Sequence, residues 1–350
     1  MLEFMNKKTL YIHIGCEKTG TTSIQSVLAD NRGTLMQQGV LYPEIGKLKF
    51  AQLLLPAALQ PLINSNKPRA DYYPGNEFLD TDTVWNDFIN LARNNAEKNI
   101  IISAEHFSSR VNGAGLQYMK NRLSELSALF NVRIITYLRR QDKFMESTYS
   151  TIIKAGGKIG FDSFYETHIG LQERYDFSLL LERWSNAFGK SAMIVRDYET
   201  EVKSKGLLYS FFEITGIEGR SLSLENENEN VSWPASIIEL ARLCNTPRLS
   251  TILGNQRVTF LDAITKSLQT EERKKVYRFN AAQRQAILDR YQESNKRVEQ
   301  EYFDGSPLFS ELATSEAQQN TTLSNEISIS KMDIVELFSH FYSANKEKFN

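Results

Sequence analysis

Short apolar runs alternate along the chain with longer segments whose apolar residues recur every three or four positions. In the first half the runs lie at about 9–15, in "NIIISAE" and in "VRIITYL", and helical patterns such as "TDTVWNDFINLARNNAEK" separate them. Fully apolar runs separated by helices are typical of parallel strands that are buried on both faces. The pattern predicts an α/β fold in three layers, with helices flanking a central, mostly parallel sheet.

The second half is mainly helical and adds one strand, in "SAMIVRDYE". Helical patterns run through "YDFSLLLERWSNAFG", "GLLYSFFEITG", "PASIIELARLCN" and "AAQRQAILDRYQESNKRVEQEYF". Near the end, "TSEAQQNTTLSNE" has the polar composition of a linker, and the tail that follows places its apolar residues on one helical face. We expect one α/β domain with helical insertions over 1–310, a polar linker over 311–330 and an amphipathic helix over 331–350.

The composition narrows the classes of partner. The 41 lysines and arginines balance the 42 aspartates and glutamates, so no bulk field draws the chain to nucleic acid, and any anion site is expected to be local. Two cysteines and four scattered histidines lack the spacing of metal ligands, which predicts a site without metal. No signal peptide pattern is present, and "FAQLLLPAALQPLI" is shorter than the roughly 20 apolar residues that span a bilayer. A cytoplasmic chain without a transmembrane segment is expected.

The stretch "YIHIGCEKTGTTSIQ" has the layout of a phosphate-binding loop with a displaced lysine. A strand runs into Gly15, and Gly20 opens a helix after four intervening residues. In nucleoside triphosphatases a lysine follows the second glycine, but that position is Thr21 here, and Lys18 lies inside the loop. N–H groups at a helix start bind anions, and the hydroxyl residues there add donors. The stretch predicts a phosphate site; the alternative is a plain helix cap.

A second candidate site lies in "YLRRQDKFMESTYS". Arg139 and Arg140 come at the end of a strand, and Ser147 lies about two turns into the following helix. A fixed guanidinium with a hydroxyl suits an isolated phosphate monoester. Alternatively, both arginines lie at the surface and pair with Asp142 or Glu146. Together with the loop, the pattern favours two separate phosphate sites, each after a parallel strand.

A third candidate site ends the strand in "IISAEHFSS". Glu105 and His106 lie at its carboxyl end, where open α/β sheets bind ligands, and either can act as a general base. The alternative is a carboxylate that caps the next turn. His13, in the first strand, is expected to be a packed strand residue.

Together, "EKTGTTS", "YLRRQDKFMESTYS" and "LLERWSNAFGKSAMIVRDYE" resemble the sulfotransferases that use 3′-phosphoadenosine 5′-phosphosulfate (PAPS), especially their bacterial branch. The family's 5′-phosphosulfate loop has the form P-K-x-G-T-T-x, and the chain departs from it only where Glu17 replaces the proline. The family's 3′-phosphate element is a strand, an arginine and then a serine eight positions on, which is the spacing of Arg139 and Ser147. The resemblance extends to about residue 310 and implies a P-loop-like fold.

The resemblance also implies a reaction: in-line transfer of a sulfuryl group from PAPS to a hydroxyl, without metal, leaving 3′,5′-adenosine bisphosphate. It implies that Lys18 stabilises the leaving oxygen and that Glu105, with His106 as second choice, deprotonates the acceptor. Arg139, with Arg140 as second choice, would hold the 3′-phosphate together with Ser147. The other implied PAPS contacts lie at the loop and helix start, namely Thr19, Gly20, Thr21, Thr22 and Ser23.

The expected acceptor is a hydroxyl-bearing small molecule, carbohydrate or glycolipid. Tyr165, Tyr175 and Trp184, in the helical second half, are candidates to stack on sugar rings. A second copy of the chain is a candidate partner through the C-terminal helix. Two alternatives stay open: a P-loop kinase or NTPase with a degenerate loop, which needs a lysine after the second glycine and a strand-end aspartate, and a non-catalytic nucleotide-binding module.

Overall fold

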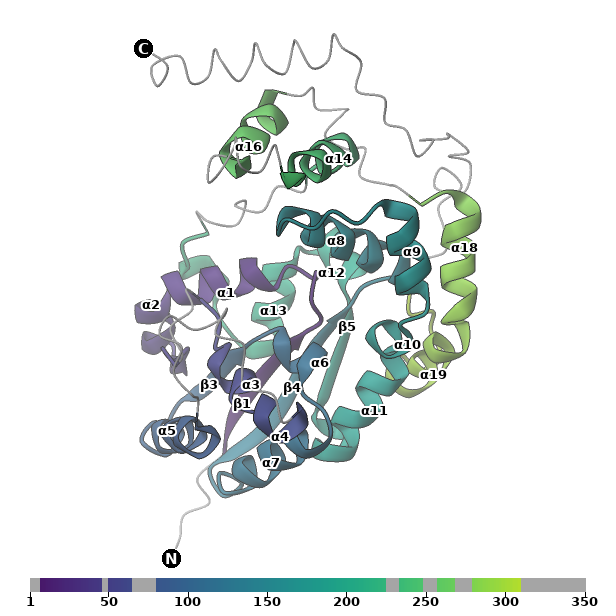
Figure 1. The fold of residues 1–350 in the computed structure, drawn as a ribbon. Helices are drawn as coiled ribbons and strands as arrows, with labels where there is room; N and C mark the ends of the chain where they lie inside the picture. Colours follow the sequence, from purple (N-terminus) through teal and green to yellow (C-terminus); the bar gives the residue numbers. More distant parts are fainter. Residues whose placement is uncertain are drawn as a thin grey trace, which may run out of the picture. The chain divides into compact units, whose positions relative to one another are not determined.

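The computed structural model describes residues 7–45, 50–64, 80–224, 233–247, 257–267 and 279–309. These residues form two compact units that interleave along the sequence. Figure 1 draws the chain with its helices and strands labelled. The first unit takes its described residues from Met1–Arg140, Asp176–Glu229 and Glu293–Ser310, and the second takes them from Gln141–Tyr175 and Asn230–Gln292. The linker expected over 311–330 and the helix expected over 331–350 lie outside the described residues. The single domain expected over 1–310 stays a prediction.

The first unit contains a five-stranded, all-parallel sheet, which confirms the predicted α/β fold. Its strands are β1 (Lys8–Gly15), β2 (Val40–Leu41), β3 (Asn99–Ser103), β4 (Phe130–Leu138) and β5 (Met193–Asp197). They lie side by side in the order β2-β3-β1-β4-β5. The apolar runs predicted four of these strands, whereas β2 has only two residues and so carries no periodicity.

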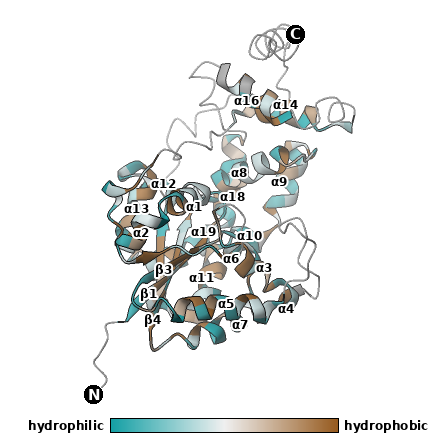
Figure 2. Cartoon of the chain, turned by 90° about the vertical axis from the view of Figure 1, so that its left-hand side faces the viewer, coloured by the Kyte–Doolittle hydropathy of each residue, from teal (hydrophilic) through white to brown (hydrophobic). Residues whose placement is uncertain are grey.

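Helices cover both faces of this sheet. The crossover from β1 to β2 runs across the sheet in the opposite direction to the three later crossovers, and right-handed crossovers of opposite direction place their helices on opposite faces. One face therefore carries α1 (Thr21–Asp30) and α2 (Arg32–Gln37), and the other carries α5 (Thr81–Arg93), α7 (Gly113–Ser124) and α11 (Phe177–Phe188). A buried apolar cluster on the first face joins Ile24 and Leu28 of α1 to Ile135 of β4 and Phe211 of α13. Figure 2 shows brown, hydrophobic residues gathered around β3 in this unit.

The helices of the first unit match most of the predicted helical patterns. They are α1 (Thr21–Asp30), α2 (Arg32–Gln37), α3 (Leu54–Ala57), α4 (Gln60–Asn64), α5 (Thr81–Arg93), α6 (His106–Arg110), α7 (Gly113–Ser124), α11 (Phe177–Phe188), α12 (Tyr198–Ser204), α13 (Leu207–Thr215) and α19 (Gln292–Tyr302). The pattern "AAQRQAILDRYQESNKRVEQEYF" forms two helices, α18 (Ala281–Arg290) of the second unit and α19, with Tyr291 between them in the sequence.

The second unit is helical and is built around α8 (Gln141–Lys154), which packs against α9, α14 and α18. Its other helices are α9 (Phe161–Ile169), α10 (Gln172–Tyr175), α14 (Ala235–Cys244), α16 (Arg257–Ser267) and α18 (Ala281–Arg290). The sequence pattern had indicated α8, α14 and α18, but not the short α9 and α10 or the helix α16.

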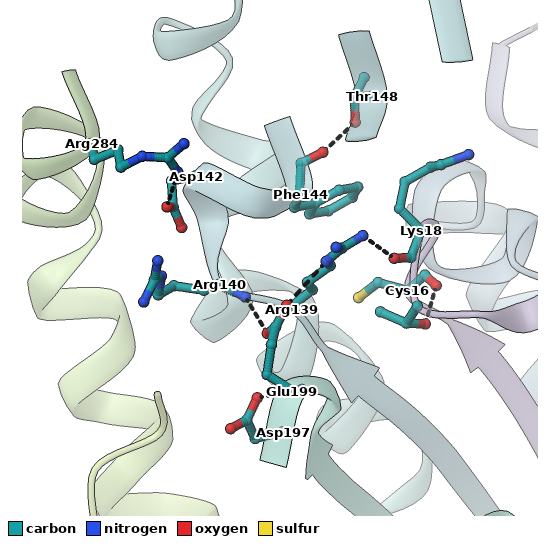
Figure 3. Close-up of polar contacts among 11 residues, drawn as sticks. Cys16, Lys18, Arg139, Arg140, Asp142, Phe144, Thr148, Asp197, Glu199 and Arg284 are labelled. Carbon is teal, nitrogen blue, oxygen red and sulfur yellow. Dashed lines mark hydrogen bonds and ion pairs between the residues drawn. The ribbon is translucent and has the colours of Figure 1, made fainter. Parts of the chain in front are cut away.

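A buried ion cluster joins α18 to α8 in the second unit. Arg284, which is 2% exposed, donates to Asp142 at 2.6 Å and to Glu146 at 2.5 Å. Figure 3 shows the Arg284 guanidinium directed at Asp142. Arg284 thus pairs with both carboxylates that the alternative offered to Arg139 and Arg140, and Arg140 is buried rather than at the surface.

Candidate functional site

The loop after β1, the residues after β3 and those after β4 meet at the carboxyl edge of the first unit's sheet. β1 is the central strand, pairing with β3 in the register His13↔Ser103 and with β4 in the register Gly15↔Thr136. The chain moves to one side of β1 for β2 and β3 and to the other side for β4 and β5. Open α/β sheets bind ligands at the carboxyl edge where the strand order reverses in this way.

The loop between β1 and α1 has an uncommon backbone. Gly15, Lys18 and Gly20 have φ values of 104°, 65° and 70°. Within the described part of the chain, Lys18 and Asp304 are the non-glycine residues with positive φ. Such a conformation is uncommon for residues with a side chain and is concentrated at functional sites. The turn places the Lys18 carbonyl where Arg139 Nη1 donates to it at 2.9 Å.

Gly20 brings the loop into close contact with the elements that follow β5. A Cβ atom at Gly20 would lie 2.3 Å from Cδ2 of Leu207 and 3.6 Å from the Tyr198 ring, so only glycine fits without displacement. The helix α1 begins at Thr21 and has no acidic residue in its first turn. Its first N–H groups therefore face the loop without a repelling carboxylate on the helix, which suits a phosphate.

The hydroxyl residues of the loop differ in how far they are buried. Thr19 is fully buried, and its hydroxyl donates to the Cys16 carbonyl at 2.7 Å, so it closes the loop on itself. Thr21 is buried, Ser23 is half-buried and Thr22 is exposed. Cys16 is 3% exposed, so it is a packed residue of the loop.

Arg139 lies between the loop and α12. Its Nε is 3.1 Å from Oε1 of Glu199 (Figure 3). Its guanidinium carbon lies 5.3 Å from the centre of the Tyr198 ring. The other oxygen of Glu199 accepts the Arg140 backbone N–H at 3.3 Å. One carboxylate and one aromatic face thus fix the guanidinium while Nη1 reaches the loop.

Ser147, the second half of the predicted 3′-phosphate element, lies on α8 as expected. It belongs to the second unit, whereas Arg139 belongs to the first. Its joint action with Arg139 stays a prediction.

Glu105 and His106 lie directly against the loop. A Cβ atom at Gly15 would be 3.3 Å from Cα of Glu105, so the loop and the turn after β3 pass in close contact. Burial lowers the pKa of His106, and Arg110 lowers it further, whereas the carboxylates of Glu105 and Glu17 raise it. The balance is a lowered pKa, which keeps His106 neutral at neutral pH.

A buried chain of polar side chains, which the sequence patterns did not indicate, leads from β1 to Glu105. Nδ1 of His13 lies 2.8 Å from Oγ of Ser103, and Nε2 of Gln25 donates to the same Oγ at 3.2 Å. The same Gln25 amide donates to Oε2 of Glu105 at 2.9 Å. His13 is fully buried, which confirms it as a packed strand residue, and burial lowers its pKa to about 3.

The three aromatic residues expected to stack on sugars differ in how far they are buried. Tyr175 and Trp184 are fully buried, so they belong to the packed interior, whereas Tyr165 is half-buried and contacts the Phe279 ring. Among the described residues no group of three or more His, Cys, Asp or Glu is arranged to hold a metal. None of the described helices has the length and apolarity needed to cross a bilayer.

No protein-family model matches the chain. It is similar to an uncharacterised protein of Archaeoglobus fulgidus, with 26% identity over 215 residues, covering 58% of this chain and 54% of that protein. The chain thus spans about half the length of that relative.

Two solved structures are similar in fold. The crystal structure of a sulfotransferase from Alicyclobacillus acidocaldarius matches at a TM-score of 0.42 and 13% identity, covering 70% of this chain and 96% of that one. The sulfotransferase domain of the olefin synthase from Synechococcus PCC 7002 matches at a TM-score of 0.36 and 14% identity, covering 81% of this chain and 96% of that domain. Both TM-scores lie below 0.5, and the similarities assign no role to any residue of this chain.

Proposed function

We propose that the chain is a sulfotransferase that moves a sulfuryl group from PAPS to a hydroxyl acceptor. The observation that carries the proposal is the meeting of three groups at one sheet edge. The loop after β1 carries its lysine inside the loop, Arg139 after β4 donates to that lysine's carbonyl, and Glu105 after β3 lies against Gly15. A lysine within the loop suits a phosphosulfate better than a triphosphate with Mg²⁺, whose loop places the lysine after the second glycine.

The loop fits a phosphate for two structural reasons. Gly15 and Gly20 let the loop pack tightly against Glu105 and Leu207, where a side chain would collide, and this packing holds the loop backbone in place for a ligand. The start of α1 directs its first N–H groups to the same place, with the hydroxyls of Thr22 and Ser23 nearby in the sequence. We assign the 5′-phosphosulfate to Lys18, Thr19, Gly20, Thr21, Thr22 and Ser23, and the 3′-phosphate to Arg139 with Ser147.

PAPS supplies the sulfuryl group, and the bond that breaks joins its sulfur to the bridging oxygen of the 5′-phosphate. Lys18 places its positive charge where the bridging oxygen gains negative charge, which lowers the barrier to its departure as 3′,5′-adenosine bisphosphate. Glu105 takes the proton of the acceptor hydroxyl while the hydroxyl oxygen forms the new bond to sulfur, and His106 is the second candidate for this step.

The acceptor that we propose is a hydroxyl of a carbohydrate or glycolipid. With Tyr175 and Trp184 buried, Tyr165 is the one of the three named aromatic residues that retains an exposed surface for stacking. A hydroxyl acceptor requires a base, and the placement of Glu105 against the loop supports this part of the proposal.

The proposed function is tested by transfer of radiolabelled sulfur from PAPS to a mixture of glycans and polar lipids. The wild-type chain should label a component of the mixture and release 3′,5′-adenosine bisphosphate in equal amount. Lys18→Met should lower the transfer rate at least about a hundredfold, because it removes charge stabilisation of the leaving oxygen. Lys120→Met, at an exposed position of α7, is the matched control and should leave the rate unchanged.

Two results would contradict the proposal. One is label transfer that is equal for the wild type and Lys18→Met. The other is phosphoryl transfer from ATP with Mg²⁺ in the absence of any transfer from PAPS, which would identify the chain as a kinase.

A further inference from the structure

We infer that Gln25 is a positioning residue for Glu105, and that it ties the proposed base to the helix that receives the donor's phosphate. The inference rests on the proposed function, because it concerns the same base, but it adds a residue to which no motif assigns a role.

The first support is the geometry of the amide. Gln25 is 3% exposed, and its Nε2 donates to Oε2 of Glu105 at 2.9 Å. Nε2 also lies 3.2 Å from Oγ of Ser103 and 3.5 Å from its carbonyl oxygen, so the carboxylate is the closest of the three acceptors. A hydrogen bond to a charged group is stronger than one between neutral groups. This hydrogen bond therefore restricts the side chain of Glu105, which otherwise rotates about three torsions.

The second support is the position of Gln25 on α1. Thr21 begins the helix at the loop, and Gln25 lies four residues later, on the same face of the first turns. An α-helix is a rigid element over this length. One turn of α1 thus fixes the distance between the start of the helix and the carboxylate of Glu105. The start of the helix is where the phosphate is proposed to bind.

The third support is the chain of polar residues behind the amide. His13 and Ser103 are fully buried in the sheet, next to apolar residues such as Ile12 and Ile102, and they connect to Gln25 through Oγ of Ser103. Polar groups in such surroundings are costly, and an apolar residue of similar size would fill the space at lower cost. A hydrogen-bonded network that ends at a carboxylate beside the loop is explained if its role is to hold that carboxylate.

The test compares Gln25→Met, which keeps the side-chain length and removes the donor, with Glu105→Gln and with the double variant. The affinity for 3′,5′-adenosine bisphosphate is measured by calorimetry, and turnover is measured as PAPS hydrolysis, with water in place of the acceptor. Ser26→Ala is the matched control, because Ser26 is equally buried on α1 and its hydroxyl lies 3.5 Å from Asp30 rather than near Glu105.

We expect Gln25→Met to lower kcat about tenfold or more while the affinity for the bisphosphate stays within about twofold of wild type. The double variant should be no slower than Glu105→Gln alone, because Gln25 acts through Glu105. Gln25→Asn, whose amide is too short to reach Glu105, is a second variant and should behave like Gln25→Met. A crystal structure of either ligand-free Gln25 variant should show the Glu105 carboxylate turned away from its wild-type position.

The inference would be overturned if the losses of kcat multiply in the double variant, or if the affinity for the bisphosphate falls as much as kcat. Gln25 would then be a structural residue. An unmoved Glu105 carboxylate in the variant crystals would overturn it as well. A wild-type chain that binds no bisphosphate is a different result, because it overturns the proposed function itself.

Discussion

Glu199 holds Arg139 by its side chain and Arg140 by its backbone. One carboxylate oxygen of Glu199 lies 3.1 Å from Nε of Arg139, and the other accepts the Arg140 N–H at 3.3 Å. The guanidinium is thereby fixed while Nη1 donates to the Lys18 carbonyl. An arginine that is ordered before the ligand arrives loses less entropy when it binds a phosphate. We therefore assign Glu199 the role of preorganising Arg139.

Glu199→Ala is predicted to weaken binding of 3′,5′-adenosine bisphosphate about tenfold, because the freed guanidinium must be ordered on binding. Calorimetric titration measures the change. Glu201→Ala is the matched control: Glu201 lies on the same helix and is paired with Lys205 at 3.3 Å, away from Arg139, so its removal should leave the affinity unchanged. Tighter binding by Glu199→Ala would contradict the prediction and would mean that the carboxylate mainly repels the ligand.

Gly20→Ala is predicted to destabilise the chain by about 2–4 kcal/mol, from the left-handed backbone and the contact with Leu207. Gly216→Ala is the control that separates these two causes. Its φ of 72° nearly equals the 70° of Gly20, but nothing lies within 4 Å of a Cβ there, so it should cost only about 1 kcal/mol. Urea unfolding of the three proteins measures the difference. Equal losses of unfolding free energy in Gly20→Ala and Gly216→Ala would show that Leu207 moves aside without cost.

Arg284→Met is predicted to destabilise the second unit by about 3–5 kcal/mol, because the buried carboxylates of Asp142 and Glu146 lose the guanidinium that pairs with both. Adding Asp142→Asn and Glu146→Gln should restore most of the loss, since neutral amides cost less to bury. Arg290→Met, at an exposed position on the same helix, should have little effect. Denaturant unfolding is the measurement, and failure of the triple variant to recover would contradict the electrostatic explanation.

His13 is predicted to make the fold sensitive to acid. Burial lowers its pKa from 6.5 to about 3, so below pH 6.5 the unfolded chain takes up a proton that the folded chain does not. The contribution to stability is fully present above pH 6.5 and is lost as the pH falls towards 3, by about 1.4 kcal/mol for each pH unit. In His13→Gln this part of the pH dependence should vanish. Unfolding free energies at several pH values test this, and parallel curves for both proteins would contradict it.

The sequence was a good guide wherever the signal lies in consecutive residues. The apolar runs predicted β1, β3, β4 and β5, and the glycine spacing placed the loop, because both patterns follow from local backbone geometry. The side-chain contacts between distant residues, in the site and in the second unit, could not be predicted from the sequence. Gln25 and Glu105 are 80 positions apart, Arg139 and Glu199 are 60 apart, and Asp142 and Arg284 are 142 apart. A single sequence contains no information on which of many distant polar residues will pair, since pairing depends on tertiary packing.

The central claim is that the chain uses PAPS as its donor. The nucleotide that stabilises the folded chain tests this claim most directly. Thermal stability is measured with 3′,5′-adenosine bisphosphate, AMP, ADP and ATP, each with and without Mg²⁺. A ligand at about 100 times its dissociation constant adds about 2.7 kcal/mol to the free energy of unfolding. The proposal predicts selective stabilisation by the bisphosphate, independent of Mg²⁺ and abolished by Arg139→Ala. Stabilisation by ATP with Mg²⁺, and none by the bisphosphate, would contradict it.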